Sequence, residues 1–235
     1  MQEDTPLVKV ISFALWQDEP RYVEGAFRNI ELAKTIYPDW VCRIFVSSKL
    51  IKKTTIERFK TYDNVDVVLV DEDPINGSLW RFLVSDDPSV ELFVVRDTDC
   101  RLSKREKEAV DQWVDSDKEF HVMRDHPFQM SPIVPNLWGM RVGNFKDMKL
   151  KTKRFIDGKY HRTTGGLAEA VMWAYIWPIA QNNSFIHDPF FTKGFDFPEK
   201  RDQEEAVWFV GEKFDENENH SEYKRRFLEH PVRVS

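Results

Sequence analysis

Short apolar runs alternate with longer periodic segments through the first half of the chain. The runs are five to eight residues long and rich in Val, Ile and Phe, which is typical of buried strands. The periodic segments place apolar residues near every third or fourth position, which predicts helices. The predicted strands are residues 8–15, 41–46, 65–70 and 92–96, and the predicted helices are residues 20–37, 51–62, 79–84 and 103–115. Strands that alternate with helices predict an α/β fold with a mainly parallel, Rossmann-like sheet flanked by helices.

The pattern becomes irregular after residue 119. A strand is predicted at residues 120–123, and the proline-rich segment 124–139 is expected to be largely loop. Residues 167–179 are apolar nearly all round, as in a buried helix. A short strand at residues 184–189 and a surface helix at residues 221–228 complete the prediction.

No repeat or linker divides the sequence, so we expect a single domain over residues 1–235. In its first part, about residues 1–118, predicted strands alternate with predicted helices, which is typical of the nucleotide-binding half of an α/β protein. Gly-x-Gly-x-x-Gly is absent after the first strand, where the chain reads Ala14-Leu15-Trp16-Gln17-Asp18, so a Rossmann-type dinucleotide site is not expected. A smaller second part covers about residues 119–211, and residues 212–235 form an acidic tail with the last helix.

Composition narrows the class of protein. Hydrophobic residues make up 41% and charged residues 31% of the 235 residues, as in a globular protein. A net charge of -6 argues against nucleic-acid binding, because a polyanion requires a basic surface. Cys42 and Cys100 are expected to be reduced, and no apolar run approaches the roughly 20 residues of a membrane span. Because the amino terminus is acidic where a signal peptide is basic, the sequence predicts a cytoplasmic protein without a membrane span.

The predicted strand at residues 92–96 is followed by two carboxylates, Asp97 and Asp99. Arg96 and Arg101 lie on either side of this pair in the sequence. Carboxylates at the carboxyl end of such a strand lie where open α/β sheets bind ligands. Mg²⁺ and Mn²⁺ are typically held by one or two carboxylates together with substrate phosphates. The pattern therefore indicates a site for a metal-bound diphosphate. The alternative is that these aspartates only start a turn or cap a helix.

Several motifs around this pair follow one another in a recognisable order. They are Arg96-Asp97-Thr98-Asp99-Cys100-Arg101, Arg105-Glu106, Trp113, residues 121–127, Trp138-Gly139, Ile176-Trp177-Pro178 and Ile186-His187-Asp188. In this order they resemble small GT-A-type glycosyltransferases of bacteria and large DNA viruses. The resemblance covers most of residues 8–211, and it implies a GT-A-like single domain with an acceptor-side half at about residues 119–211.

The resemblance implies a metal-dependent glycosyltransferase that moves a sugar from a nucleotide-diphospho-sugar, a UDP- or GDP-sugar, to a hydroxyl of a glycan acceptor. A Mn²⁺ or Mg²⁺ ion would neutralise the charge that develops on the leaving diphosphate. Asp99 is the first choice as direct ligand, and Asp97 binds the metal directly, through water, or binds the ribose instead. His187 is a candidate third ligand, and its alternative is a strand-end histidine satisfied by the backbone.

Donor binding is predicted for the Asp97-Thr98-Asp99 segment and for further residues outside it. Arg81 and Arg96 are candidates for the diphosphate, because a guanidinium matches phosphate oxygens bidentately. Their alternative is an ordinary ion pair with a nearby acid. Leu15 and Trp16 would lie at the nucleotide base, although a tryptophan there is as often part of the core.

The acceptor side departs from the family pattern at two places. Ala168-Glu169 stands where similar sequences carry Asp-Gln, and Ala168 cannot take a proton from the acceptor hydroxyl, so Glu169 or Asp188 is the candidate base. Val134-Pro135-Asn136-Leu137 replaces a loop that is usually rich in glycine, which predicts a differently shaped acceptor pocket. The candidate acceptor-binding residues are Asp125, His126 and Trp138.

Two other functions are compatible with these residues. A sugar-nucleotide nucleotidyltransferase shares the sheet and an acidic metal site, but generally needs a glycine-rich loop after the first strand. A non-catalytic nucleotide-sugar-binding domain descended from a transferase is suggested by the Ala168-Glu169 departure.

Overall fold

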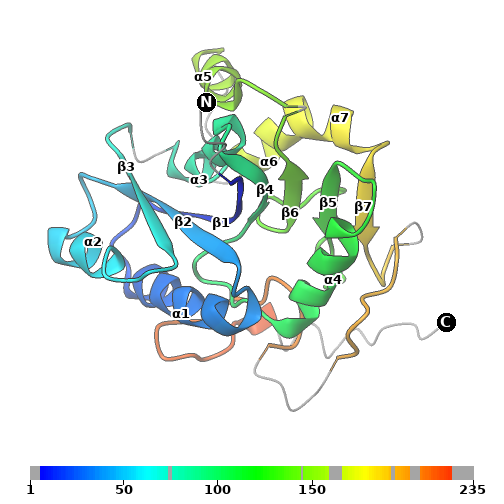
Figure 1. Cartoon of the computed structure of the whole chain (residues 1–235), viewed down its shortest axis with the longest axis horizontal. Coiled ribbons are helices and arrows are strands. Elements are labelled where there is room, and N and C mark those ends of the chain that lie inside the picture. Colours follow the sequence, from blue (N-terminus) through cyan, green and yellow to red (C-terminus); the bar gives the residue numbers. More distant parts are fainter. Residues whose placement is uncertain are drawn as a thin grey trace.

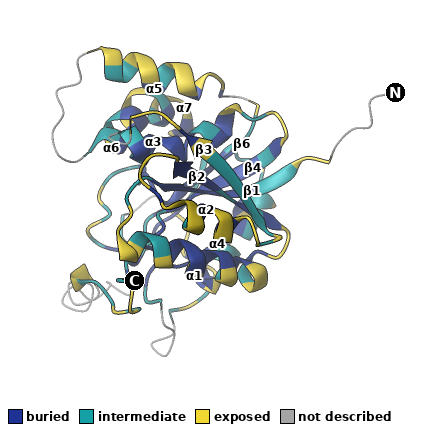
Figure 2. Ribbon diagram, turned by 90° about the vertical axis from the view of Figure 1, so that its left-hand side faces the viewer, coloured by how far each residue is buried: buried dark blue, intermediate teal, exposed yellow. Residues whose placement is uncertain are grey.

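One mixed sheet of seven strands forms the centre of the protein, with helices on both faces (Figures 1 and 2). The structure is a computed structural model and describes residues 6–73, 76–143, 145–158, 166–191, 194–201 and 207–223. The strands are β1 (Val8–Leu15), β2 (Trp40–Ser47), β3 (Val65–Val70), β4 (Val90–Val95), β5 (Phe120–Met123), β6 (Trp138–Arg141) and β7 (Ser184–His187). Their order across the sheet is β3-β2-β1-β4-β6-β5-β7.

The strands of the first half are parallel to one another, as predicted. β1 pairs with β2 and with β4, and β2 pairs with β3, all in parallel register. β6 is antiparallel to both β4 and β5, whereas β5 and β7 are parallel. The sequence prediction placed the start of β6 in a loop, because a strand of four residues behind three prolines gives no periodic pattern. β6 joins the second half of the chain to the first half in one continuous sheet.

Successive strand residues point to opposite faces of the sheet, and each face has its own core. Ile11, Phe13 and Leu15 of β1 pack with α1, α2 and α4, while Val10 and Ala14 pack on the other face. Figure 2 shows this division, with α1, α2 and α4 below the sheet and α3, α5, α6 and α7 above it. The helices are α1 (Pro20–Ile36), α2 (Lys53–Phe59), α3 (Gly77–Trp80), α4 (Lys104–Val114), α5 (Met148–Asp157), α6 (Leu167–Val171) and α7 (Trp177–Ala180).

The apolar segment at residues 167–179 differs from its prediction. It consists of α6, one π-helical turn at Met172–Ile176, and α7. One side packs against the sheet core, but Trp173 and Ile179 on the outside are 49% and 48% exposed. Apolar composition therefore overstated how deeply this segment is buried.

The helix α5 was not predicted, because five of its ten residues are charged and few are apolar. The surface helix predicted at residues 221–228 lies mostly outside the described residues. None of the helices in the described part of the chain is long and apolar enough to cross a membrane.

Candidate functional site

The Asp97-Thr98-Asp99 segment forms the turn that follows β4 at the carboxyl end of the sheet. β1 pairs with β2 on one side and with β4 on the other, so the chain order reverses between β1 and β4. Open α/β sheets bind ligands in the crevice at such a reversal. The Arg96 backbone N–H donates to the Ser12 carbonyl at 3.0 Å and fixes the start of the turn to β1. The turn therefore lies at the position that the sequence predicted for it.

Two residues of α1 hold the backbone of this turn. Asn29 Nδ2 donates to the carbonyls of Thr98 (3.1 Å) and Cys100 (2.8 Å), and Asn29 Oδ1 accepts from the Leu102 N–H at 3.0 Å. Gly25, one helical turn earlier, lets α1 approach closely, since a Cβ there would lie 2.2 Å from the Thr98 carbonyl oxygen. Our sequence reasoning missed both residues. The available signal was a buried asparagine within the apolar face of a helix, where a polar side chain needs a partner.

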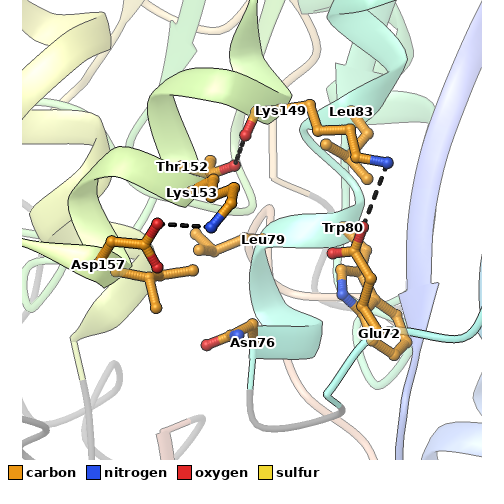
Figure 3. Close-up of a pocket in the computed structure, with 10 residues that line it drawn as sticks. Glu72, Asn76, Leu79, Trp80, Leu83, Lys149, Thr152, Lys153 and Asp157 are labelled. Atoms are coloured by element: carbon orange, nitrogen blue, oxygen red, sulfur yellow. Dashed lines mark hydrogen bonds and ion pairs between the residues drawn. The ribbon is translucent and has the colours of Figure 1, made fainter.

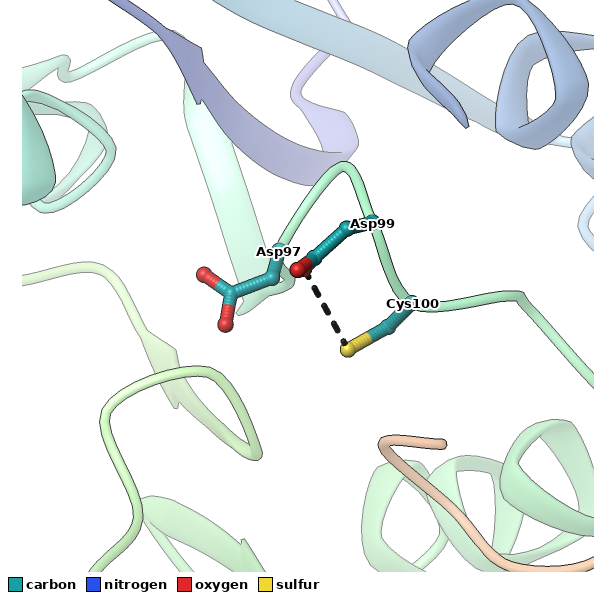
Figure 4. A group of neighbouring side chains, drawn as sticks. All are labelled: Asp97, Asp99 and Cys100. Carbon is teal, nitrogen blue, oxygen red and sulfur yellow. Dashed lines mark hydrogen bonds between the residues drawn. The ribbon is translucent and has the colours of Figure 1, made fainter. Parts of the chain in front are cut away.

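The side chains of Asp97, Asp99 and Cys100 gather on one side of the turn (Figure 4). One possible ligand atom from each lies within 4.8 Å of the others. Carboxylate oxygens are the donors that Mg²⁺ and Mn²⁺ prefer, so Asp97 and Asp99 fit the metal that the family resemblance implies. Burial raises the pKa of Cys100 to about 12, so its sulfur is a protonated thiol at neutral pH, and sulfur is not the donor that Mg²⁺ and Mn²⁺ prefer. The two carboxylates are therefore the metal-binding candidates in this cluster.

Two cationic side chains contact these carboxylates. Arg81 Nη1 forms a short ion pair with Asp97 Oδ1, and Lys213 Nζ lies 3.3 Å from Asp99 Oδ2 and 3.8 Å from Asp97 Oδ2. Burial lowers the pKa of Arg81 to about 10, which leaves it charged at neutral pH. Burial alone would lower the pKa of Lys213, but the neighbouring Asp99 carboxylate helps to raise it overall. The site therefore combines two acids with two permanent cations.

Glu169, the candidate base, lies at the beginning of α6 on the same side of the sheet as Arg81. Its side chain is exposed, and its charge counteracts the fall in the pKa of Arg81. Arg81 also contacts Asp97, so Glu169 and Asp97 both act on the same guanidinium. The role of Glu169 as the catalytic base stays a prediction.

The end of β1 and the start of the turn enclose a small hollow. Leu15, Trp16, Tyr22, Asp97 and Thr98 are among the residues that line it. The hollow has a volume of only about 10 Å³, enough for about one water molecule. Leu15 is 1% exposed and belongs to the core, whereas Trp16 is half-buried. A nucleotide base would enter here only if Trp16 or Tyr22 turned aside.

A larger pocket lies on the other side of Lys213. It has a volume of about 200 Å³ and combines aromatic with polar side chains. Phe128 and Tyr223 are 42% and 40% exposed, whereas His126 is buried at the pocket wall. The lining residues are His126, Phe128, Gln129, Val134, Asn136, Phe209, Gly211, Lys213 and Tyr223. Among the predicted acceptor residues, His126 is the one that reaches this pocket.

Arg96 does not face the diphosphate site. Its side chain is 2% exposed and forms a buried ion pair with Glu106, with Nε 3.0 Å from Oε1. The hydroxyl of Tyr37 donates to the same carboxylate oxygen at 3.0 Å. The ordinary ion pair that was the alternative for Arg96 is therefore what the structure contains.

His187 is the last residue of the edge strand β7, is buried, and lies outside the Asp97–Asp99 cluster. Its Nε2 lies 2.9 Å from Gln112 Oε1, and its Nδ1 lies 2.9 Å from His121 Nε2. Because an amide oxygen accepts, His187 Nε2 carries the proton and Nδ1 accepts from His121. No lone pair of the ring is left for a metal, so we remove His187 from the candidate ligands. Its partners are side chains and not the backbone that the alternative had suggested.

Three more predicted site residues have internal partners. Asp188 is 4% exposed, pairs with Arg124 at 2.5 Å and accepts from two backbone N–H groups, so its carboxylate shapes a turn. Asp125 is fully buried between two arginines. Trp138 is fully buried and packs edge-on against Phe82 and Phe93. The side chain of each residue thus makes internal contacts that hold the fold together. This placement corrects the expectation of a catalytic or acceptor-binding role.

A further pocket lies between α3 and α5, with a volume of about 290 Å³ (Figure 3). Its floor is apolar, and ion pairs between Lys149 and Glu72 and between Lys153 and Asp157 flank it. None of the residues that the sequence singled out for chemistry lines this pocket.

No family model and no curated protein matches the sequence, but several solved structures match the fold. The galactosyltransferase LgtC, in complex with donor and acceptor sugar analogues, is 10% identical over 78% of this chain and 74% of its own, with a TM-score of 0.51. A glycosyltransferase involved in glycosylation of the major capsid of PBCV-1 is 13% identical over 80% of this chain and 84% of its own (TM-score 0.49). A 4-diphosphocytidyl-2C-methyl-D-erythritol synthase from Anaerococcus prevotii is 10% identical over 72% and 84% (TM-score 0.42). The likeness to LgtC confirms the predicted GT-A fold; at this identity it establishes the fold alone.

Proposed function

We propose that this protein is a glycosyltransferase that takes a sugar from a nucleotide-diphospho-sugar and transfers it to a hydroxyl of a glycan. The observation that carries the proposal is the pair of carboxylates at the strand-order reversal, Asp97 and Asp99, with the cation Arg81 beside them. Acids that hold a divalent cation, together with a guanidinium, match the charge of a diphosphate. LgtC, which has this fold, is known in complex with donor and acceptor sugar analogues, and this supports the same class of reaction.

For the donor, we assign the diphosphate to Arg81 and to a Mn²⁺ or Mg²⁺ ion held by Asp97 and Asp99. When bound, such an ion supplies a Lewis acid that neutralises the leaving diphosphate. Trp16 and Thr98 line the hollow at the end of β1, where we place the nucleoside. Trp16 would turn to stack on the base, since the hollow has no room for a base as it stands.

For the acceptor, we propose the pocket between His126 and Lys213. Its exposed aromatic side chains, Phe128 and Tyr223, offer flat apolar surface of the kind that stacks on a sugar ring, and Asn136 and Gln129 offer hydrogen bonds. We assign proton removal from the acceptor hydroxyl to Glu169, because a base needs an accessible carboxylate and Glu169 is exposed near Arg81.

The first test measures donor binding by calorimetry with UDP and with GDP in the presence of Mn²⁺. We expect wild type to bind one of the two nucleotides and Asp99→Asn to lose this binding. Asp117→Asn is the matched control, because it removes the same charge from a side chain that is 88% exposed and distant from the turn. Equal binding by Asp99→Asn and wild type would contradict the assignment of the donor site.

The second test measures turnover of UDP- and GDP-sugars with a panel of glycan acceptors. Glu169→Gln is expected to lower kcat by roughly 100-fold while donor affinity is kept, as for loss of a general base. Pyrophosphate release from a nucleoside triphosphate and a sugar 1-phosphate would identify a nucleotidyltransferase instead. Donor binding without turnover on any acceptor, and without donor hydrolysis, would identify a non-catalytic binding domain.

A further inference from the structure

Lys213 occupies a place that a metal ion would also need. Its ammonium lies between the two carboxylates, 3.3 Å from Asp99 Oδ2 and 3.8 Å from Asp97 Oδ2. Arg81 contacts the other oxygen of Asp97. Two negative charges are therefore balanced by two positive charges within the protein itself, before any ion or substrate binds.

The backbone fixes Lys213 at this position. Cys100 and Lys213 form an antiparallel bridge, and the Phe214 N–H donates to the Asp99 carbonyl at 2.8 Å. The Lys213 carbonyl in turn accepts from the Ser221 N–H at 3.0 Å. Lys213 thus belongs to a segment that pairs directly with the turn, so its ammonium reaches the carboxylates without a large rearrangement of the backbone.

We propose that Lys213 is an internal counter-ion that competes with a divalent cation for the Asp97 and Asp99 carboxylates. The inference rests on the proposed donor site and adds a control on its metal affinity. A divalent ion that approaches the occupied pair meets a neutral cluster, whereas the pair without Lys213 would still carry a negative charge. Metal binding therefore requires the Lys213 side chain, which is 43% exposed, to swing out towards solvent.

The test measures Mn²⁺ affinity directly, by the loss of the electron paramagnetic resonance signal of free Mn²⁺, with no nucleotide or acceptor present. Lys213→Gln is expected to raise the association constant by about tenfold, the lower end of the range over which groups that contact the ligands change metal affinity. Lys213→Arg keeps the cation and is expected to bind Mn²⁺ as weakly as wild type. Adding Asp99→Asn to Lys213→Gln should remove the gain, which locates the ion at this pair.

The matched control is Lys153→Gln, which removes the same charge from a side chain that is 70% exposed on α5. Its Mn²⁺ affinity should stay within about twofold of wild type, since distant exposed charges are screened by salt. Circular dichroism and thermal unfolding establish that each variant is folded, and Lys213→Met provides a second uncharged variant if Lys213→Gln does not fold. A Lys213 variant that binds Mn²⁺ no more tightly than wild type overturns the inference. Because no donor is present, this result is independent of whether the protein transfers sugars.

Discussion

Two buried aspartates of this protein, Asp99 and Asp125, have similar sequence surroundings and very different environments. Each follows a strand of the same sheet, and each is less than 3% exposed. Asp125 accepts from Arg105 Nε (2.8 Å) and Nη2 (2.9 Å), from Arg201, and from the Val210 N–H at 3.0 Å. The Asp99 carboxylate has Lys213 at 3.3 Å and the Cys100 thiol at 4.0 Å.

The difference separates a structural carboxylate from one that can bind a ligand. A buried carboxylate is stable when hydrogen-bond donors surround its oxygens. Three residues donate to the Asp125 carboxylate. Asp99 is buried with fewer donors around it, so an added cation or donor would improve its environment. The sequence could not distinguish the two, because Arg201 and Val210, which donate to Asp125, and Lys213, which contacts Asp99, lie more than 75 positions later in the chain.

The largest effect on stability is expected from Asp125→Asn. The substitution keeps the shape but removes the buried carboxylate charge that faces Arg105 and Arg201. Breaking a buried ion pair by removing one partner costs about 4 kcal/mol. In a protein of this size that corresponds to a fall in Tm of roughly 10 °C. Urea unfolding followed by circular dichroism measures the change directly.

Asp117→Asn is the control for this prediction, because the Asp117 side chain is 88% exposed. It should change the unfolding free energy by less than about 0.5 kcal/mol. If Asp125→Asn changed the unfolding free energy as little as Asp117→Asn, the Asp125 carboxylate would not be needed for the fold and could have the acceptor-binding role that the sequence suggested.

A smaller but still large effect is expected from Gly25→Ala. The added Cβ would lie 2.2 Å from the Thr98 carbonyl oxygen and 2.9 Å from Arg101 Nη1, so α1 or the turn must shift. Overpacking of this kind costs up to about 3 kcal/mol, which exceeds the gain of about 1 kcal/mol from replacing a helical glycine. The expected result is lower stability together with weaker nucleotide binding, measured by urea unfolding and calorimetry.

Gly158→Ala is the matched substitution for Gly25→Ala. Gly158 follows α5 with a φ of -72°, and the nearest atom to an added Cβ is 3.1 Å away. This variant should be close to wild type in both measurements. Equal stability of the two variants would mean that α1 does not hold the turn as closely as described.

The parts of the fold that could be predicted from the sequence are those with a regular burial pattern. Strands β1 to β4 have long apolar runs and α1 has helical spacing, so their types and approximate bounds followed from periodicity. β6 has four residues, and its pairing with β4 depends on contacts between distant segments. α5 has a charged surface and a narrow buried side formed by Met148 and Thr152. Neither element carries enough local signal to be found.

In the candidate site, as in the fold, the residues that form a local sequence pattern could be predicted and those that come from distant segments could not. Asp97 and Asp99 were found because a strand followed by two acids is a local pattern. Lys213 could not be found, since 113 positions separate it from Cys100, its partner in the bridge. His187 was a candidate metal ligand because the family resemblance suggested it, and its true partners, Gln112 and His121, are also distant in sequence. Local motifs therefore located the acids, and only the fold identified which side chains face them.

Acid is expected to destabilise the protein through His187. Burial lowers its pKa to about 4, and burial also lowers the pKa of His121 well below the usual value. In the unfolded chain both take up protons near pH 6.5, so folding excludes protons and stability falls as the pH falls from about 6.5 towards 4. For His187 alone the loss between pH 7 and pH 5 is about 2 kcal/mol.

The measurement for this prediction is the unfolding free energy at pH 7 and at pH 5. The variant His121→Gln/His187→Gln is the comparison, since it removes both titrating groups while glutamine can still form hydrogen bonds. Its stability should depend less on pH than that of wild type. The same dependence in both proteins would mean that the two histidines are not held neutral in the folded state, and His187 would again be a possible metal ligand.

The smallest effect on stability, and the sharpest contrast with Asp125, is expected from Asp99→Asn. Removal of one charge relieves the repulsion between Asp97 and Asp99, and the partly exposed Lys213 can turn towards solvent. The unfolding free energy should therefore change by less than about 1 kcal/mol or increase, as is common where a site trades stability for binding. Urea unfolding of Asp99→Asn and Asp125→Asn side by side measures the contrast. If Asp99→Asn lost as much stability as Asp125→Asn, Asp99 would be a structural carboxylate, and the donor site would have to be sought elsewhere.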